Sequence, residues 1–253
     1  MTHEERTSTG ADSRRLAVWS GPRNISTALM RAWENRGDTA VCDEPFYAHY
    51  LLKTGKRHPG AQEVIAGQEN DWRKVVEFLS GPVPDGKPIF YQKHMAHHLL
   101  PDMGRDWLPG LTHCFLVRQP REMLASLDEK LDEVRLEDTG LPQQLEIFES
   151  VRRRTGTPPP VVDSRDVLEA PEAVLRRLCD AVDVRFTSKM LTWPPGRRNT
   201  DGVWSRFWYD SVEKSTGFAP YRPREGTLPA HLERLHDECM EYYETLYAYR
   251  LAP

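Results

Sequence analysis

The sequence predicts an α/β fold in which helices cover both faces of a central, mostly parallel sheet, so that the domain has three layers. Short apolar runs bounded by turn residues alternate with longer segments whose apolar residues recur at helical spacing. Parallel strands are buried on both faces and therefore read as unbroken apolar runs of this kind. Since most runs are followed by a helical segment, the connections are the crossovers that a parallel sheet requires.

Five short apolar runs are the expected strands, at residues 16–19, 39–42, 89–92, 113–117 and 161–162. Helices are expected from Ser26 to a stop at Gly37, and over residues 61–80, 120–131, 171–182 and 229–250. Residues 193–227 are rich in Gly, Pro, Arg and aromatic residues and show little periodicity, which predicts a long functional segment.

The chain has 253 residues, which fits one α/β domain with insertions at the usual ~150 residues per domain. Residues 1–15 are too polar to repay their ordering entropy, so we expect a disordered tail there and a single domain over residues 16–253. The tail lacks the apolar core of a signal peptide, and no stretch approaches the ~18 apolar residues of a membrane span.

Charge and cysteine content exclude further classes of function. There are 34 Lys and Arg residues against 38 Asp and Glu, and a net charge of −4 argues against a general nucleic-acid binder. The four cysteines are far apart, which predicts neither a zinc site nor a disulfide framework. We therefore expect a cytoplasmic protein without nucleic-acid or membrane partners.

The first expected strand, its loop and the next helix have the geometry of an anion-binding site. The loop reads S-G-P-R-N-I-S-T over residues 20–27. A helix N-terminus presents unpaired N–H groups and the positive end of the helix dipole. Arg23 adds a cation, and Ser26 and Thr27 add hydroxyl groups that could instead simply cap the helix. The loop lacks the Gly-Lys of a Walker A motif.

A second basic site follows the strand at residues 113–117. Arg118 stands at the end of that strand, and Ser126 lies in the next helix. Ligands of open parallel sheets bind beyond the carboxyl ends of the strands, so Arg118 is expected to face the same crevice as Arg23. A nucleotide kinase would place an acidic residue here to hold Mg²⁺. The sequence therefore predicts an anion site that needs no metal.

Three blocks resemble the sulfotransferases that use 3′-phosphoadenosine-5′-phosphosulfate (PAPS). P-R-N-I-S-T at 22–27 is similar to the loop for the 5′-phosphosulfate, with Ile25 where that family often has Gly. Arg118 and Ser126, eight residues apart, resemble the 3′-phosphate site. R-R-N-T-D-G-V-W at 197–204 is similar to the C-terminal segment that closes over the nucleotide. The blocks occur in the order expected of the family.

The resemblance implies a P-loop NTPase-like fold and transfer of a sulfonate from PAPS to a hydroxyl or amine of a small-molecule acceptor. Arg23 would stabilise the leaving group, and no metal is implied. Arg197 and Arg198 would reach the 3′-phosphate, or would form a solvated charge pair in a loop. The nucleotide-binding residues that the resemblance implies are Arg23, Asn24, Ser26, Thr27, Arg118, Ser126, Arg197 and Arg198.

Two groups of residues are candidates for the base that deprotonates the acceptor. Glu44 follows the second expected strand, where several sulfotransferase branches carry a catalytic Glu; it could also cap a turn. Burial there would raise its pKa towards a useful value. Q-K-H-M-A-H-H-L-L-P at 92–101 resembles the family's K-T-H-L-P segment, in which Lys and His are catalytic. We rank Glu44 first, with Lys93 as an additional cation and His94 or His97 as the alternative base.

The remaining expectations concern the acceptor and other functions. Trp33 is expected in the core, whereas the aromatic run at 204–209 either stacks on adenine or lines the acceptor pocket. Acceptor-contacting loops are expected near 46–70, 128–150 and 203–225. The alternative functions are an atypical P-loop small-molecule kinase and a non-catalytic nucleotide-binding module. The sequence names neither the acceptor nor the oligomeric state, and a homodimer stays open.

Overall fold

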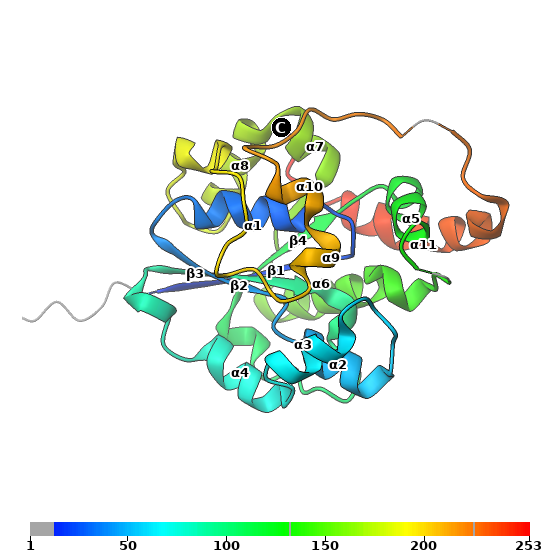
Figure 1. Cartoon of the computed structure of the whole chain (residues 1–253). Helices are drawn as coiled ribbons and strands as arrows, with labels where there is room; N and C mark the ends of the chain where they lie inside the picture. Colours follow the sequence, from blue (N-terminus) through cyan, green and yellow to red (C-terminus); the bar gives the residue numbers. More distant parts are fainter. Residues whose placement is uncertain (1–12, 132, 225) are drawn as a thin grey trace, which may run out of the picture.

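The computed structural model describes residues 13–253 apart from 132 and 225. Within these residues, five strands form one parallel sheet in the order β2-β3-β1-β4-β5 (Figure 1). The predicted α/β fold with a central parallel sheet between helices is confirmed. The strands are β1 (Arg14–Ser20), β2 (Thr39–Asp43), β3 (Ile89–Met95), β4 (Thr112–Val117) and β5 (Val161–Asp163).

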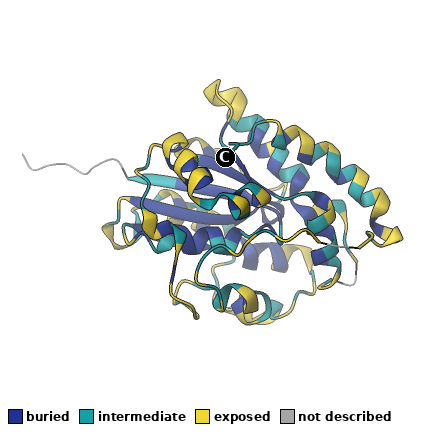
Figure 2. Ribbon diagram, turned by 90° about the horizontal axis from the view of Figure 1, so that it is seen from above, coloured by how far each residue is buried: buried dark blue, intermediate teal, exposed yellow. Residues whose placement is uncertain are grey.

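Helices cover both faces of the sheet and give three layers. On one face, Leu16 and Val18 of β1 share a core with residues of α1 (Ser26–Glu34), α7 (Ser164–Glu169) and α8 (Pro171–Ala181), and Trp33 belongs to this core as expected. On the other face, Ala17 and Trp19 pack with α4 (Trp72–Ser80), α6 (Leu141–Thr155) and α11 (Glu233–Tyr247). Figure 2 shows the resulting contrast between buried strands and helices exposed along their outer sides.

The remaining helices lie around the carboxyl ends of the strands. They are α2 (Tyr47–Thr54), α3 (Ala61–Gly67), α5 (Pro120–Asp128), α9 (Ser205–Trp208) and α10 (Asp210–Glu213). Single 3₁₀ turns occur at η1 (Pro84–Gly86), η2 (Ala96–His98), η3 (Leu108–Gly110), η4 (Leu136–Thr139), η5 (Ser188–Leu191) and η6 (Ala230–Leu232).

The helix expected over 61–80 is two helices, and that prediction was wrong. Gln68 leaves helical geometry with φ −126° and ψ 149°, which ends α3. Its side chain instead accepts from the backbone N–H of Ala48 and donates to the carbonyl oxygen of Glu44. Asp71 then caps α4 by accepting from the backbone N–H of Arg73 at 3.0 Å. The break therefore exists because Gln68 ties α3 to the end of β2.

Several other boundaries differ from the sequence predictions. β1 begins at Arg14, so residues 14–15 belong to the sheet and not to the expected tail, whose residues 1–12 lie outside the described residues. β3 extends to Met95 instead of ending at 92. Helices α2 and α6 fill much of the stretches expected as loops at 46–70 and 128–150, and α9 and α10 lie within the irregular segment 193–227.

Candidate active site

The loop between β1 and α1 has a strained backbone that the helix N-terminus follows directly. Arg23 and Ile25 have φ of 62° and 57°, in the left-handed region that residues other than Gly seldom adopt. The helix begins at Ser26 after Ile25 in the N-cap position, and among the described residues no side chain caps it. Ser26 and Thr27 therefore keep their hydroxyl groups for another partner.

A glycine brings this loop against the segment before α6. A Cβ added to Gly21 would stand 2.2 Å from the carbonyl oxygen of Thr139, so only Gly permits this approach. The side chain of Asn24 points into the sheet, where its amide donates to the carbonyl oxygen of Leu116 at 3.3 Å. These two contacts fix the loop on the carboxyl end of the sheet.

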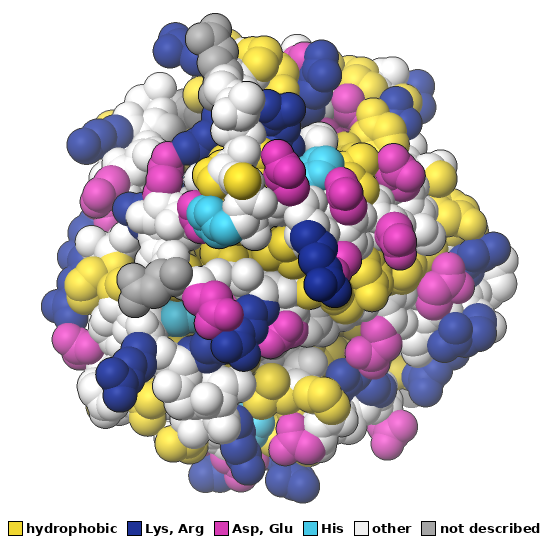
Figure 3. Space-filling view, turned by 90° about the vertical axis from the view of Figure 1, so that its right-hand side faces the viewer, with side chains coloured by type: hydrophobic (Ala, Val, Ile, Leu, Met, Phe, Trp, Pro, Cys, Tyr) yellow, Lys and Arg dark blue, Asp and Glu magenta, His cyan; other side chains and the backbone are white. Residues whose placement is uncertain are grey.

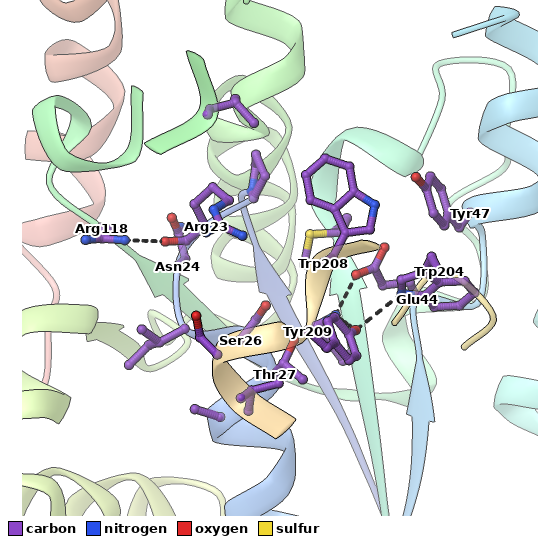
Figure 4. A pocket seen from close by; sticks show the side chains of 18 of the residues that line it. Arg23, Asn24, Ser26, Thr27, Glu44, Tyr47, Arg118, Trp204, Trp208 and Tyr209 are labelled. Carbon is purple, nitrogen blue, oxygen red and sulfur yellow. Dashed lines mark hydrogen bonds and ion pairs between the residues drawn. The ribbon is translucent and has the colours of Figure 1, made fainter. Parts of the chain in front are cut away.

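Two arginines lie together beside this loop (Figure 4). Arg23 donates from Nε to the Ser126 hydroxyl at 2.9 Å, and Arg118 donates to the carbonyl oxygen of Arg23 at 2.6 Å. Burial, and next the charge of Arg118, lower the pKa of Arg23. Two cations held this close favour an anionic ligand, because such a ligand would relieve their repulsion.

A buried charge cluster occupies the neighbouring strand ends. Lys93 of β3 donates to the carboxylates of Asp43 at 2.8 Å and Glu44 at 2.6 Å, and to the hydroxyl of Tyr209 at 2.9 Å. The Tyr209 hydroxyl donates in turn to the other oxygen of Asp43 at 2.7 Å. The side chains of Lys93 and Asp43 are each 1% exposed and that of Glu44 is 11% exposed. The cluster thus joins β2, β3 and the irregular segment.

Burial and charge set the protonation of this cluster. Burial opposes the charged form of Lys93, yet Asp43 and Glu44 hold its pKa well above the ordinary value. Burial raises the pKa of Glu44, Lys93 partly offsets that effect, and Asp43 adds to it. A carboxylate with a raised pKa accepts a proton more readily than an ordinary one, which is what a general base requires.

The backbone also fixes Glu44. Its φ of 43° places it in the left-handed region, directly after the last residue of β2. Its backbone N–H donates to the carbonyl oxygen of Lys93 at 2.9 Å, and its own carbonyl oxygen accepts from Gln68 at 3.0 Å. Strain held by several contacts at one residue is typical of functional sites.

One cavity of about 360 Å³ contains both the arginine end and the carboxylate end. Pro22 to Ala28, Arg118, Glu44 and Lys93 all line it. The wall around Glu44 is aromatic and is formed by Tyr47, Tyr50, His58, His97, His98, Trp204, Trp208 and Tyr209. Tyr47 and the ring of His98 stack with their centroids 4.7 Å apart.

The imidazoles in this wall are neutral near pH 7. Burial lowers the pKa of His97 to about 3 and that of His98 well below its ordinary value. In the described part of the chain, the Nδ1 atoms of both rings are buried without a hydrogen-bond partner. Of the two candidate bases in this cavity, Glu44 has the pKa shift that increases basicity, whereas the shift of His97 decreases it.

Four of the predicted site residues lie elsewhere. The ring of His94 points to the opposite face of the sheet and stacks on Trp19 at 4.2 Å, because neighbouring residues of β3 alternate between faces. Arg197 donates to the Ser205 hydroxyl, and Arg198 pairs with Glu34 on α1 at 2.6 Å. Neither arginine lines the cavity. Ser126 does not line it either, but its hydroxyl accepts a hydrogen bond from Arg23, which does.

Sequence reasoning missed part of the cluster. The sequence patterns give no catalytic role to Asp43, and they place Tyr209 only in the aromatic run at 204–209. Gly202 was matched only to a motif, yet a Cβ there would lie 2.1 Å from the ring of Trp204, which needs this Gly to pack. The G-x-W spacing was the available signal for this close packing.

Comparison with known proteins gives the family. The sulfotransferase domain family matches residues 14–250. The chain belongs to the sulfotransferase domain family. Sulfonate transfer is the activity of this domain family, as the resemblance of the three sequence blocks implied.

Two curated relatives from Arabidopsis thaliana match most of this sulfotransferase domain. Branched-chain-amino-acid aminotransferase-like protein 2 is 34% identical over 233 residues, which are 91% of this chain and 41% of that protein. Branched-chain-amino-acid aminotransferase-like protein 1 is 35% identical over 231 residues, or 90% of this chain and 40% of that protein. The chain spans about two fifths of the length of these relatives.

Solved sulfotransferase structures share the fold. The sulfotransferase domain of the Synechococcus PCC 7002 olefin synthase has a TM-score of 0.56 at 16% identity, covering 99% of this chain and 100% of that one. A sulfotransferase from Alicyclobacillus acidocaldarius has a TM-score of 0.51 at 12% identity, covering 95% and 98%. The α/β fold with a central parallel sheet flanked by helices is thus shared with these sulfotransferase domains.

Two further findings bear on cofactors and location. Within residues 13–131, 133–224 and 226–253, no three His, Cys, Asp or Glu side chains are grouped to hold a metal ion. Over the same part of the chain, no helix has the length and apolar character needed to cross a bilayer.

Proposed function

We propose that this sulfotransferase domain transfers the sulfonate of PAPS to a hydroxyl group, or an amine, of a small-molecule acceptor. One observation carries the proposal: a single cavity holds the paired Arg23 and Arg118 at one end and the Glu44–Lys93 ion pair at the other. The first pair suits the anionic donor, and the second suits deprotonation of the acceptor.

The arginine end would bind the nucleotide. Arg118 would hold the 3′-phosphate by charge-assisted hydrogen bonds. Arg23, the uncapped N-terminus of α1 and the hydroxyls of Ser26 and Thr27 would surround the 5′-phosphosulfate. Asn24 would hold the loop in shape through its bond to Leu116, and Ser126 would orient Arg23.

The chemical step follows from the positions of the charged groups. Glu44 takes the proton of the acceptor hydroxyl, and the acceptor oxygen forms a bond to sulfur. The bond between sulfur and the bridging phosphate oxygen breaks, and adenosine 3′,5′-bisphosphate leaves with that oxygen. Arg23 stabilises the charge that develops on it, by the electrostatic positioning known from phosphoryl transfer.

Lys93 has a supporting role in this scheme. All three of its partners are protein groups, and the ammonium is 1% exposed. Its charge keeps Glu44 ionised before the acceptor arrives, because an isolated carboxylate would be costly at this depth. The proposed scheme gives no role to Arg197 or Arg198, because neither lines the cavity and Arg198 pairs with Glu34.

Metal-free nucleotide binding tests the proposal. Isothermal calorimetry with adenosine 3′,5′-bisphosphate is expected to give the same affinity with and without EDTA, because Arg118 stands where a kinase holds Mg²⁺ with an acidic residue. Binding of ATP that disappears on chelation would favour the kinase alternative instead.

Turnover separates the enzyme from a non-catalytic module. Release of adenosine 3′,5′-bisphosphate from PAPS is measured against a panel of phenols, alcohols and amines, with Glu44→Gln as the matched inactive control. Acceptor-dependent release by the wild-type domain alone is the expected result. Tight nucleotide binding without any acceptor-dependent release across the panel would favour the module.

A further inference from the structure

A carboxylate stands directly behind the arginine that would hold the 3′-phosphate. Glu122 of α5 accepts a hydrogen bond from Nε of Arg118 at 3.1 Å, and the same carboxylate oxygen forms an ion pair with a terminal nitrogen of Arg118, also at 3.1 Å. The other terminal nitrogen of Arg118 donates to the carbonyl oxygen of Arg23 at 2.6 Å. All three nitrogens of the guanidinium group are thus engaged by the protein, and its orientation is fixed before any ligand binds.

The second oxygen of Glu122 connects this arginine to a distant part of the chain. It accepts from the hydroxyl of Tyr221 at 2.5 Å. Tyr221 belongs to residues 219–224, which we call the strap and which pass over α7 on the way from α10 towards α11 (Figure 1). The hydrogen bond to Glu122 raises the pKa of Tyr221, so the hydroxyl remains a donor at neutral pH.

Two further contacts hold the strap in this position. The guanidinium group of Arg165 on α7 lies over the ring of Tyr221, 4.9 Å from its centroid. Arg224 forms an ion pair with Glu129, at the end of α5. Acidic and basic side chains are interspersed over the face that carries α5 and α11, as ion pairs of this kind require (Figure 3).

A carboxylate so near an anion site needs a reason. The side chain of Glu122 is 13% exposed and its charge repels a phosphate, so by itself it weakens binding. Glu122 offsets this repulsion by keeping Arg118 in the orientation that binds the phosphate. A bidentate contact between a guanidinium group and a phosphate depends on that orientation. Its second bond makes that orientation depend on the strap as well.

We propose that Glu122 is a positioning residue through which Tyr221 of the strap controls how tightly Arg118 holds the 3′-phosphate. The inference rests on the proposed function. According to this inference, Arg118 alone does not determine how well the domain distinguishes nucleotides with a 3′-phosphate from those without one. That selectivity depends on the hydrogen-bonded series Tyr221–Glu122–Arg118.

The test is a change of selectivity in Tyr221→Phe, which removes only the hydroxyl. Affinities are measured by calorimetry for adenosine 3′,5′-bisphosphate and for adenosine 5′-monophosphate, which lacks the 3′-phosphate. The bisphosphate is expected to bind about 10-fold more weakly, near the lower end of what a lost hydrogen bond to a charged group costs. The monophosphate should bind as before. Tyr242→Phe on α11, outside the cavity lining, is the matched control.

A second variant tests whether Tyr221 acts on Arg118 through Glu122. In a Glu122→Ala background, Tyr221→Phe should cause no further loss of bisphosphate affinity, because the connection is already broken. Thermal unfolding of each variant, compared with Tyr242→Phe, shows whether the fold is kept. An equal loss for both nucleotides, no loss for either, or an additive double variant would each overturn the inference.

The wild-type measurement separates this inference from the proposed function. If the wild-type domain prefers the bisphosphate to the monophosphate, the proposed donor site stands and the Tyr221 variants judge the inference alone. A wild-type domain that binds the two nucleotides equally would overturn the donor site and this inference together.

Discussion

Lys93→Met keeps most of the side-chain volume but removes the ammonium group that pairs with the buried carboxylates of Asp43 and Glu44. Asp43 and Glu44 are 1% and 11% exposed, so each would be left charged with little water to solvate it. Breaking a buried ion pair by removing one partner typically costs about 3–5 kcal/mol. At about 2–4 °C per kcal/mol for a chain of this size, the melting temperature should fall by about 6–20 °C.

The same variant should become more stable as the pH falls. Without the lysine, burial leaves the folded-state pKa of Glu44 above its unfolded value of about 4.3. The penalty is therefore absent below pH ~4, grows as the pH rises between the unfolded and folded pKa values, and is constant above the folded value. Urea denaturation of variant and wild type at a series of pH values from 4.5 to 8 measures this difference.

Two comparison variants complete the experiment. Lys93→Met combined with Asp43→Asn and Glu44→Gln removes all three charges and should recover part of the lost stability, because a neutral cluster needs no counter-ion. Arg176→Met breaks the exposed pair with Glu172 on α8 and should cost less than about 1 kcal/mol. A Lys93→Met loss as small as that of Arg176→Met, or one that does not change with pH, would refute the buried charge cluster.

Three further outcomes are expected. Glu44→Gln should lower the rate of single-turnover transfer from PAPS by ~10²–10⁴-fold with little change in nucleotide affinity, whereas His97→Asn should change mainly acceptor affinity. Near-normal turnover in Glu44→Gln together with an inactive His97→Asn would identify the imidazole as the base. Arg118→Ala should weaken binding of the 3′-phosphorylated nucleotide by roughly one to two decades relative to the analogue without that phosphate, and equal weakening in calorimetry would make Arg118 structural. Gly21→Ala should lower the melting temperature, since overpacking typically costs about 1–3 kcal/mol, whereas Gly110→Ala, with open space around its Cβ, should not; equal shifts would contradict the close approach at the loop.

The strands and the position of the site were predictable because both depend on local patterns. The run at 16–19 is apolar on every residue, and the run at 113–117 is apolar after His113, which is typical of strands covered on both faces. Once a parallel sheet is predicted, the residues that follow its strands must meet at one edge. Arg23, Glu44 and Arg118 were found in this way, and all three line the cavity.

What the sequence could not provide depends on contacts between distant residues. The apolar periodicity runs on through residues 61–80, whereas the bonds of Gln68 to residues after β2 end α3 at this point. The placement of His94 required the true end of β3, because a strand ending at 92 says nothing of the face on which residue 94 lies. Tyr209 joins Lys93 across 116 positions of sequence, which no local pattern reveals.

The strand order has a consequence for how the domain reaches this structure. β1 lies at the centre of the sheet, yet its partners are β3 and β4, so Leu16 pairs with Tyr91 and with Thr112. Every hydrogen-bonded neighbour of the central strand lies more than 70 residues along the chain, and loop closure must precede the gain from pairing. During synthesis, the apolar run at 16–19 must therefore wait for residues 89–117 before it is covered. Slow folding, and association between chains at this stage, are the expected cost of placing the loop that we propose to bind the phosphosulfate directly after the innermost strand.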